Sequence, residues 1–315
     1  MRRILSIDGG GIKGVCPAAF LAVVETSLGK PIVDFFDLIV GTSTGGIIAL
    51  GLGLGLTASD ILRFYEEHGP LVFCGNRFIR GLRRLGYSKY NQDALRKALS
   101  THFGERRLGE SRTRLVIPSM NLETGEVHLF KTSHAPRFEH DYRERAVEVA
   151  LATTAAPTYF PTHRTAAGTP LVDGGMWANN PVGVAVAEAI GVLGWPREDL
   201  RVLSLGCSSS PLDVGLARFL PSGLGYWATK LVDVLMAAQS SSALGTAQVV
   251  VGKANVIRIN PVVPKGRFRL DDPREIDSLK GLGSAEARKA LPELRPVFFQ
   301  QAAETFEPYH RLDPR

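Results

Sequence analysis

The sequence predicts an α/β protein with three layers, α/β/α, in which helices cover both faces of a mainly parallel central sheet. Short apolar segments alternate along the chain with longer segments of helical periodicity, and this alternation is typical of parallel sheets. Hydrophobic residues make up 44% of the 315 residues, which is ample for such a core. Since no Pro/Ser-rich linker, low-complexity tract or repeat divides the chain, we expect a single domain over residues 1–315.

Each element is predicted from its local pattern. Apolar, β-branched or aromatic runs predict strands at residues 2–7, 35–40, 113–118, 126–130, 169–172, 200–206 and 255–260. Helical apolar spacing predicts helices at residues 17–28, 45–55, 58–68, 91–101, 143–154, 182–193, 225–250 and 285–306. We expect residues 225–250 to form a packed helix and not the wall of a lipid tunnel; a lid over the active site is the alternative.

Residues 41–45 have the spacing G-x-S-x-G between two apolar runs. A buried strand that turns at once into a buried helix needs a sharp bend, and glycines at both ends let its arms approach. Ser43 would then lie at the tip of the bend, at a helix N-terminus that favours an oxyanion. This is the spacing of a nucleophile elbow, although a plain glycine-rich turn has the same short pattern.

Two further glycine-rich stretches follow predicted strands. Gly9, Gly10 and Gly11 come directly after the first strand, and their backbone N–H groups are not shielded by side chains. Asp173 ends another short strand and is followed by two glycines. Because sites in open α/β sheets form at the carboxyl ends of the strands, we expect Ser43, Asp173 and the glycine loop to converge there.

Together these stretches resemble the patatin-like phospholipases, a family of serine acyl hydrolases. The family's motifs are D-G-G-G-x-[RK]-G, G-x-S-x-G and D-G-[GA]. This chain has them in the same order, at residues 8–14, 41–45 and 173–175. Residues 155–161 and 179–181 are also similar to the family, and the resemblance covers at least residues 1–210. Lys13 stands where many members have arginine, which keeps the positive charge.

The resemblance implies a patatin-like fold and acyl transfer without a metal or cofactor. Ser43 would attack an ester carbonyl, Asp173 would accept its proton, and the N–H groups of Gly10 and Gly11, helped by Gly9, would hold the oxyanion. A free carboxylate has a pKa near ~4 and is a poor base for a hydroxyl. We therefore expect Asp173 to be shielded from water.

A histidine is the alternative base. His163 lies ten residues before Asp173 and is the best-placed neighbour, whereas His310 is the only histidine after Asp173 and lies close to a charged chain end. The other five are expected on the surface or in loops: His68, His102, His128, His134 and His140. We favour the serine–aspartate pair.

Charge and apolar patterning bear on partners and location. Residues 77–114 have a net charge of +8, with apolar residues interleaved; a solvated helix face, a phospholipid surface or a nucleotide would each fit. No nucleic-acid-binding pattern accompanies the charge. Residues 38–59 lack charges but contain six glycines, which fits a strand–turn–helix better than a membrane span. Asp8 interrupts the first apolar run, so we expect no secretion signal and a cytoplasmic, membrane-associating protein. Three scattered cysteines, Cys16, Cys74 and Cys207, predict reduced thiols.

The rival function is phosphate or nucleotide binding by residues 8–14. They fit G-x-G-x-x-G literally, but the acidic residue that should end the next strand is missing, and Val15-Cys16 replaces the Lys-Ser/Thr of a P-loop. The resemblance implies a lipid substrate, in particular membrane phospholipid. Some compact bacterial members of the family act in anti-phage signalling and are activated by a cyclic nucleotide, and this chain is similar to them in size and over residues 87–121. The sequence is compatible with an oligomer.

Overall fold

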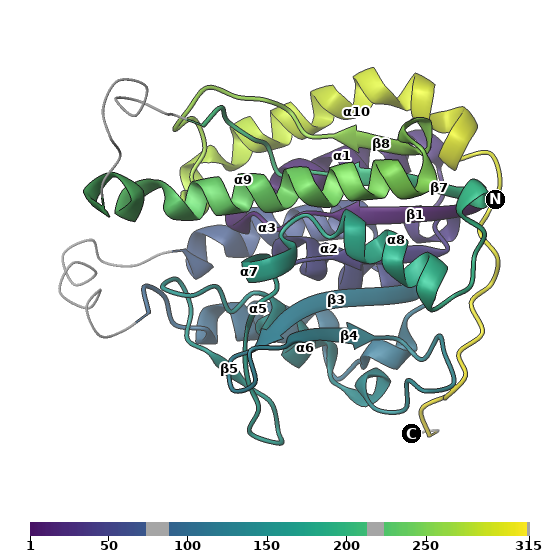
Figure 1. Cartoon of the computed structure of the whole chain (residues 1–315), viewed down its shortest axis with the longest axis horizontal. Coiled ribbons are helices and arrows are strands. Elements are labelled where there is room, and N and C mark those ends of the chain that lie inside the picture. The colour runs from purple at the N-terminus through teal and green to yellow at the C-terminus, as the bar shows by residue number, and fades with distance from the viewer. Residues whose placement is uncertain (74–87, 213–223, 314–315) are drawn as a thin grey trace.

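The computed structural model describes residues 1–73, 88–212 and 224–313. One eight-stranded sheet has the order β5-β6-β3-β2-β1-β7-β8, and β4 pairs with β3 (Figure 1). The strands are β1 (Arg2–Ile7), β2 (Leu38–Gly41), β3 (Arg114–Asn121), β4 (Val127–Lys131), β5 (His163–Arg164), β6 (Pro170–Asp173), β7 (Leu200–Leu205) and β8 (Val256–Ile259).

The sheet is mainly parallel, as predicted. β3, β2, β1, β7 and β8 run in one direction, whereas β4 and β6 are antiparallel to β3, and β5 is antiparallel to β6. Residues of β1 and β2 are buried on both faces of the sheet, with Arg2 as the exception. Strands covered on both faces read as continuous apolar runs, which is why the sequence located them.

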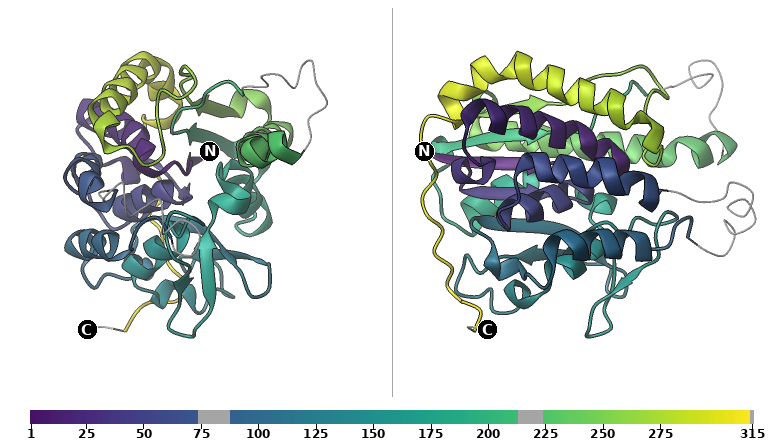
Figure 2. Two further views of the ribbon diagram at one scale, coloured as in Figure 1. Left: turned by 90° about the vertical axis from the view of Figure 1, so that its left-hand side faces the viewer. Right: turned by 180° about the vertical axis from the view of Figure 1, so that it is seen from behind.

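Helices cover both faces, which confirms the three-layer α/β/α class (Figure 2). One face is covered by α1 (Val15–Leu28), α2 (Thr44–Gly53), α3 (Ala58–Val72), α5 (Asp93–Phe103), α6 (Ala146–Thr153) and α10 (Ile276–Phe298). The other face is covered by α8 (Val182–Gly191) and α9 (Leu224–Val251), with the short α7 (Gly175–Ala178) nearby. The larger core lies on the first face.

Most predicted elements are present with shifted ends; the bounds of two elements are wrong, and one short strand was not predicted. Residues 32–35 form a 3-10 helix, so β2 starts only at Leu38. The two-residue β5 has no counterpart in the predicted strands. The last helix was predicted at 285–306 but spans Ile276–Phe298. Its early turns contain glycines that look like helix breakers; Gly283 is there because α1 is so close that a Cβ atom would come within 2.1 Å of the Cys16 carbonyl oxygen.

The helix predicted at residues 225–250 is present, but it packs along one side only. α9 contacts α8 and α7 along one side, but only 11% of the window Leu231–Val251 is buried. Two helices of the described chain are long and apolar enough to cross a membrane, this one and the window Gly11–Leu28, of which 61% is buried. The window Gly11–Leu28 is mostly buried, as expected for a core helix. Of these two helices, α9 is therefore the one with a long exposed apolar surface.

The strand–turn–helix prediction for residues 38–59 holds, because these residues form β2, the turn, α2 and the start of α3. Cys16 and Cys207 are buried free thiols, as predicted. Cys74 and residues 77–87 of the basic segment lie outside the described residues.

Candidate active site

The connection between β2 and α2 has the geometry of a sharp elbow. β2 ends at Gly41, and α2 begins at Thr44. A Cβ atom on Gly41 would come within 2.1 Å of the Gly45 carbonyl oxygen, and one on Gly45 within 2.3 Å of the Ile7 carbonyl oxygen. Ser43 has φ 54° and ψ −121°, a strained conformation for a residue with a side chain. The turn thus requires glycine on both sides of a strained serine.

Ser43 and Asp173 lie in direct contact. The Ser43 Oγ donates a hydrogen bond of 2.6 Å to Asp173 Oδ2, and the Gly175 N–H donates one of 2.7 Å to Oδ1. Ser43 is 9% exposed and Asp173 is 5% exposed. Burial raises the pKa of Asp173 to about 6, although both hydrogen bonds oppose the shift. Such a carboxyl is ionised at neutral pH, yet it is a stronger base than a solvated carboxylate.

Asp173 reaches this position by a route that the sequence did not predict. Asp173 ends β6, as expected, but β6 is antiparallel to β3 in the mainly parallel sheet. The register pairs Asp173 with Ser119, and Val40 of β2 with Val116 of β3. Ser43 and Ser119 each lie three residues beyond that second pair, so Asp173 and Ser43 stand at the same level of the sheet. The expected contact between Ser43 and Asp173 is present, and each follows or ends its strand, although the strands do not all run in the same direction.

The glycine loop after β1 lies beside the elbow. A Cβ atom on Gly9 would be 3.2 Å from the Ser43 Cβ. The Gly9 N–H donates a hydrogen bond of 2.9 Å to the Asn179 carbonyl oxygen, so it is already engaged. For the N–H groups of Gly10 and Gly11, the described part of the chain provides no acceptor. Of the three N–H groups predicted to hold an oxyanion, those of Gly10 and Gly11 are therefore the two without an acceptor among the described residues.

Thr153, at the end of α6, contacts the elbow but was missed by the sequence analysis. Its Oγ1 accepts a hydrogen bond of 3.0 Å from the Ser43 N–H and donates one of 2.6 Å to the Pro118 carbonyl oxygen. It thereby holds the strained backbone in place. The only sequence signal is a pair of threonines at the end of an alanine-rich helix. This pattern indicates where the helix ends but does not show which residues Thr153 contacts.

The histidines lie elsewhere among the described contacts. His163 is on the β5–β6 hairpin, as suggested, but its Nε2 lies 3.6 Å from Glu148 Oε2. The His310 Nε2 contacts the Pro136 carbonyl oxygen. His134, expected on the surface or in a loop, is in a loop but buried, and its Nε2 lies 2.9 Å from Glu188 Oε1. Within residues 1–73, 88–212 and 224–313, no histidine bonds to Ser43 or Asp173, and no group of three or more metal-ligating side chains is found.

Comparison with known proteins agrees with this architecture. The family model described as "Patatin-like phospholipase" matches residues 5–186. A "cGAMP-activated phospholipase" of Pseudomonas aeruginosa is 34% identical over 315 residues, which covers 95% of this chain and 92% of that protein. A protein of the same description from Vibrio cholerae is 34% identical and covers 65% of this chain and 63% of its own length. "Patatin-like protein 2" of Oryza sativa is 30% identical over 67% of this chain and 62% of its own length.

The fold and these matches define a lipid acyl hydrolase. The chain belongs to the patatin-like phospholipase family.

Proposed function

We propose that Ser43 and Asp173 are the catalytic dyad of this phospholipase. The observation that carries the proposal is the 2.6 Å hydrogen bond from the Ser43 hydroxyl to a buried carboxylate. As Ser43 Oγ bonds to the ester carbonyl carbon, its proton moves to Asp173, and the carbonyl oxygen becomes an oxyanion. When the intermediate collapses, the C–O bond to the alcohol breaks, and the alcohol oxygen takes the proton from Asp173. Water then attacks the acyl-serine; its proton passes through Asp173 to Ser43 Oγ, and the fatty acid is released.

The N–H groups of Gly10 and Gly11 are our candidates for the oxyanion hole. They follow Gly9, whose Cβ position lies 3.2 Å from the Ser43 Cβ, and the described part of the chain provides no acceptor for them. The Gly9 N–H, in contrast, holds the loop against Asn179. Donors fixed before the reaction stabilise the developing charge without reorganisation, and one such donor contributes about 3 kcal/mol to the transition state.

The same loop fits a nucleotide phosphate poorly. A phosphate-binding loop presents successive free N–H groups. Here the Gly9 N–H donates to Asn179, the Ile12 N–H to Leu270, and the Lys13 N–H to Gly10. Two free donors suit a single oxyanion better than a di- or triphosphate, which favours acyl transfer over the rival function.

We infer that the substrate is phospholipid in a membrane, met from the cytoplasmic side. The exposed side chains of α9 support this inference: Trp227, Leu231 and Leu235 recur every four residues and are 40%, 47% and 57% exposed. In Figure 1 the amino-terminal end of α9 extends past the other helices, on the side to which the parallel strands run. An apolar stripe on a helix surface is suited to the boundary of a bilayer.

We also propose activation by a cyclic nucleotide and a role in antiviral defence. The support is the relative described as cGAMP-activated, which aligns with 95% of this chain. Fatty-acid release should rise with the concentration of one member of a cyclic nucleotide panel; flat responses to every member would contradict the activation. The single sheet from β1 to β8 supports one domain for residues 1–315.

The decisive experiment is fatty-acid release from defined liposomes by the wild type and Ser43→Ala. Both should fold, and the variant should lose activity by about 10⁴-fold or more. A serine-directed fluorophosphonate probe should label only the wild type. If Ser43→Ala keeps wild-type activity, the dyad is wrong. If neither protein cleaves any lipid with any member of the cyclic nucleotide panel present, but the probe labels Ser43, the lipid substrate is wrong.

The stripe on α9 has its own test. Leu231→Asp should lower liposome hydrolysis about tenfold and leave the cleavage of a water-soluble ester unchanged, because only membrane binding is weakened. Val249→Asp is the matched control: Val249 is 85% exposed on the same helix, but about 27 Å further along it, at 1.5 Å per residue. Equal losses from both variants would contradict a membrane-facing amino-terminal end.

A further inference from the structure

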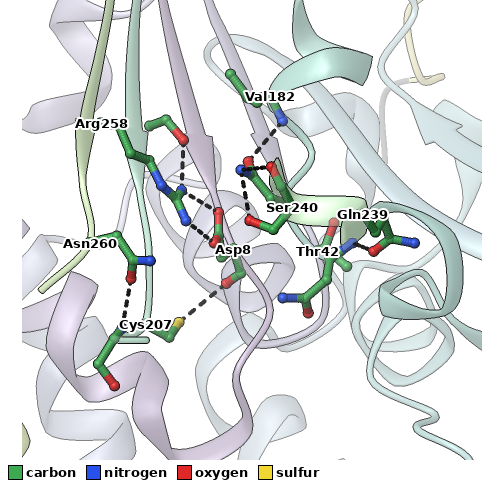
Figure 3. A network of polar contacts seen from close by, with 12 residues as sticks. Asp8, Thr42, Val182, Cys207, Gln239, Ser240, Arg258 and Asn260 are labelled. Carbon is green, nitrogen blue, oxygen red and sulfur yellow. Dashed lines mark hydrogen bonds and ion pairs between the residues drawn. The ribbon is translucent and has the colours of Figure 1, made fainter. Parts of the chain in front are cut away.

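The glycine loop begins at a buried ion pair that joins two distant parts of the chain. Asp8 directly follows β1, and Arg258 lies on the edge strand β8. The Arg258 Nη1 donates a hydrogen bond of 2.7 Å to Asp8 Oδ1, and Nη2 donates to Oδ2, so the guanidinium holds both carboxylate oxygens (Figure 3). Nη1 also donates a hydrogen bond of 2.8 Å to Ser204 Oγ. A bidentate contact of this kind fixes orientation as well as distance.

Asp8 is held at three points. Its N–H donates a hydrogen bond of 2.9 Å to the Leu205 carbonyl oxygen, and its carbonyl oxygen accepts a contact of 3.4 Å from Cys207 Sγ. Figure 3 shows Arg258 at the carboxylate of Asp8 and the Cys207 sulfur at its backbone carbonyl. The peptide that leads into the loop therefore has little freedom, and the direction of the following N–H groups depends on it.

We propose that Arg258 is a positioning residue for the oxyanion loop. By holding both oxygens of Asp8, Arg258 fixes the start of the loop that carries the Gly10 and Gly11 N–H groups. This inference rests on the proposed acyl transfer at Ser43. The loop reaches the elbow directly: a Cβ atom on Gly45 would come within 2.8 Å of the Asp8 carbonyl oxygen. A displacement of Asp8 therefore shifts the donors relative to the nucleophile.

Charge gives a second reason for this role. Burial raises the pKa of Asp8, and Arg258 opposes that shift. Without the guanidinium, a buried carboxylate would lose its principal partner and either take up a proton or turn toward water. Both outcomes release the first residue of the loop.

The test compares Arg258→Met with Arg3→Met, using a water-soluble short-chain ester and the full-length chain. Arg3 is the matched control, because it is a buried arginine at the opposite end of β1 that bonds to carbonyl oxygens of residues 298 and 302. For Arg258→Met we expect a fall in kcat of about 100-fold with KM little changed, since misplaced donors weaken only the transition state. For Arg3→Met we expect the kcat of the folded protein to stay at the wild-type value.

Arg258→Lys keeps the experiment decisive if Arg258→Met does not fold. Lysine keeps the charge but cannot hold both oxygens in a fork, so kcat should be intermediate. Thermal unfolding of each variant gives the folded fraction by which rates are corrected. Wild-type kcat in either Arg258 variant, or an equal loss in Arg3→Met, would overturn the proposal. If the wild type is not labelled by the fluorophosphonate probe and does not cleave the ester, the proposed function itself is overturned.

Discussion

The two ends of β1 each carry a buried group of arginine and aspartate, and they are built differently. At the amino end, Asp37 accepts hydrogen bonds of 3.1 Å from Arg2 Nη1 and 2.8 Å from the Arg3 N–H. The Arg3 guanidinium in turn bonds to the carbonyl oxygens of Phe298, at the end of α10, and of Ala302 in the C-terminal tail, which runs along this side of the molecule in Figure 1. At the carboxyl end, Asp8 and Arg258 form one pair beside the reacting groups.

The two ends differ in whether their polar groups have hydrogen-bond partners and relaxed geometry. At the amino end, the Asp37 carboxylate and the Arg3 guanidinium both have hydrogen-bond partners, and these bonds hold the tail against the sheet. At the carboxyl end, Gly10 and Gly11 keep N–H groups without acceptors in the described chain, Ser43 is strained, and the pKa of Asp173 is raised. We infer that the groups at the carboxyl end lower the stability of the fold because they are arranged for catalysis. The predictions below test this contrast.

Among the changes that leave Ser43 in place, Asp173→Asn should have the largest effect on activity. Loss of the base should lower kcat by about 10²–10⁴-fold. The same change should stabilise the protein at pH 7 by on the order of 2 kcal/mol, because the pKa of about 6 means that an ionised Asp173 is unfavourable in the native state.

The pH dependence of that stabilisation is its control. The native state holds the Asp173 proton more tightly than the unfolded chain, so the carboxyl favours folding below about pH 4, and this contribution is lost as the pH rises through about 6. The stability of Asp173→Asn relative to wild type should therefore grow between pH 4 and pH 7 in urea titrations. A constant difference would mean that the pKa of this carboxyl is not raised.

Arg3→Met should show the opposite combination. The variant leaves the carbonyl oxygens of Phe298 and Ala302 without their donor, which should cost about 2–4 kcal/mol of unfolding free energy. Rates corrected for the folded fraction should match the wild type. A fall in corrected kcat would show that the two ends of β1 are coupled and would remove the contrast drawn above.

The pH–rate profile reports on the carboxyl end alone. Asp173 acts as a base only when ionised, so kcat/KM for a soluble ester should fall tenfold per pH unit below about 6 and level off above it. A midpoint near pH 4 would indicate a solvated carboxylate. Circular dichroism at each pH separates this titration from acid unfolding.

The sequence predicted what is local and missed what is paired at a distance. The elbow, the glycine loop and Asp173 were found because each motif lies within a few residues. The antiparallel direction of β6 was missed, since a four-residue apolar run gives no sign of its partner's direction. The contact of Arg258 with Asp8 spans 250 positions, and no local pattern marks it. The exposure of α9 was missed because an apolar helix has the same periodicity whether its apolar residues are buried or exposed.

Ser43→Gly should reveal the strain at the elbow, the smallest of these effects. Ser43 has φ 54° and ψ −121°, a conformation that glycine adopts readily and a residue with a Cβ does not. Ser43→Ala is the matched control, because it also removes the hydroxyl and its hydrogen bond to Asp173 but keeps the Cβ. Glycine should therefore be more stable than alanine by about 1 kcal/mol in urea unfolding, even though glycine elsewhere loses more entropy on folding. Alanine equal to or more stable than glycine would mean that the elbow holds no strain, and that the carboxyl end is as relaxed as the amino end.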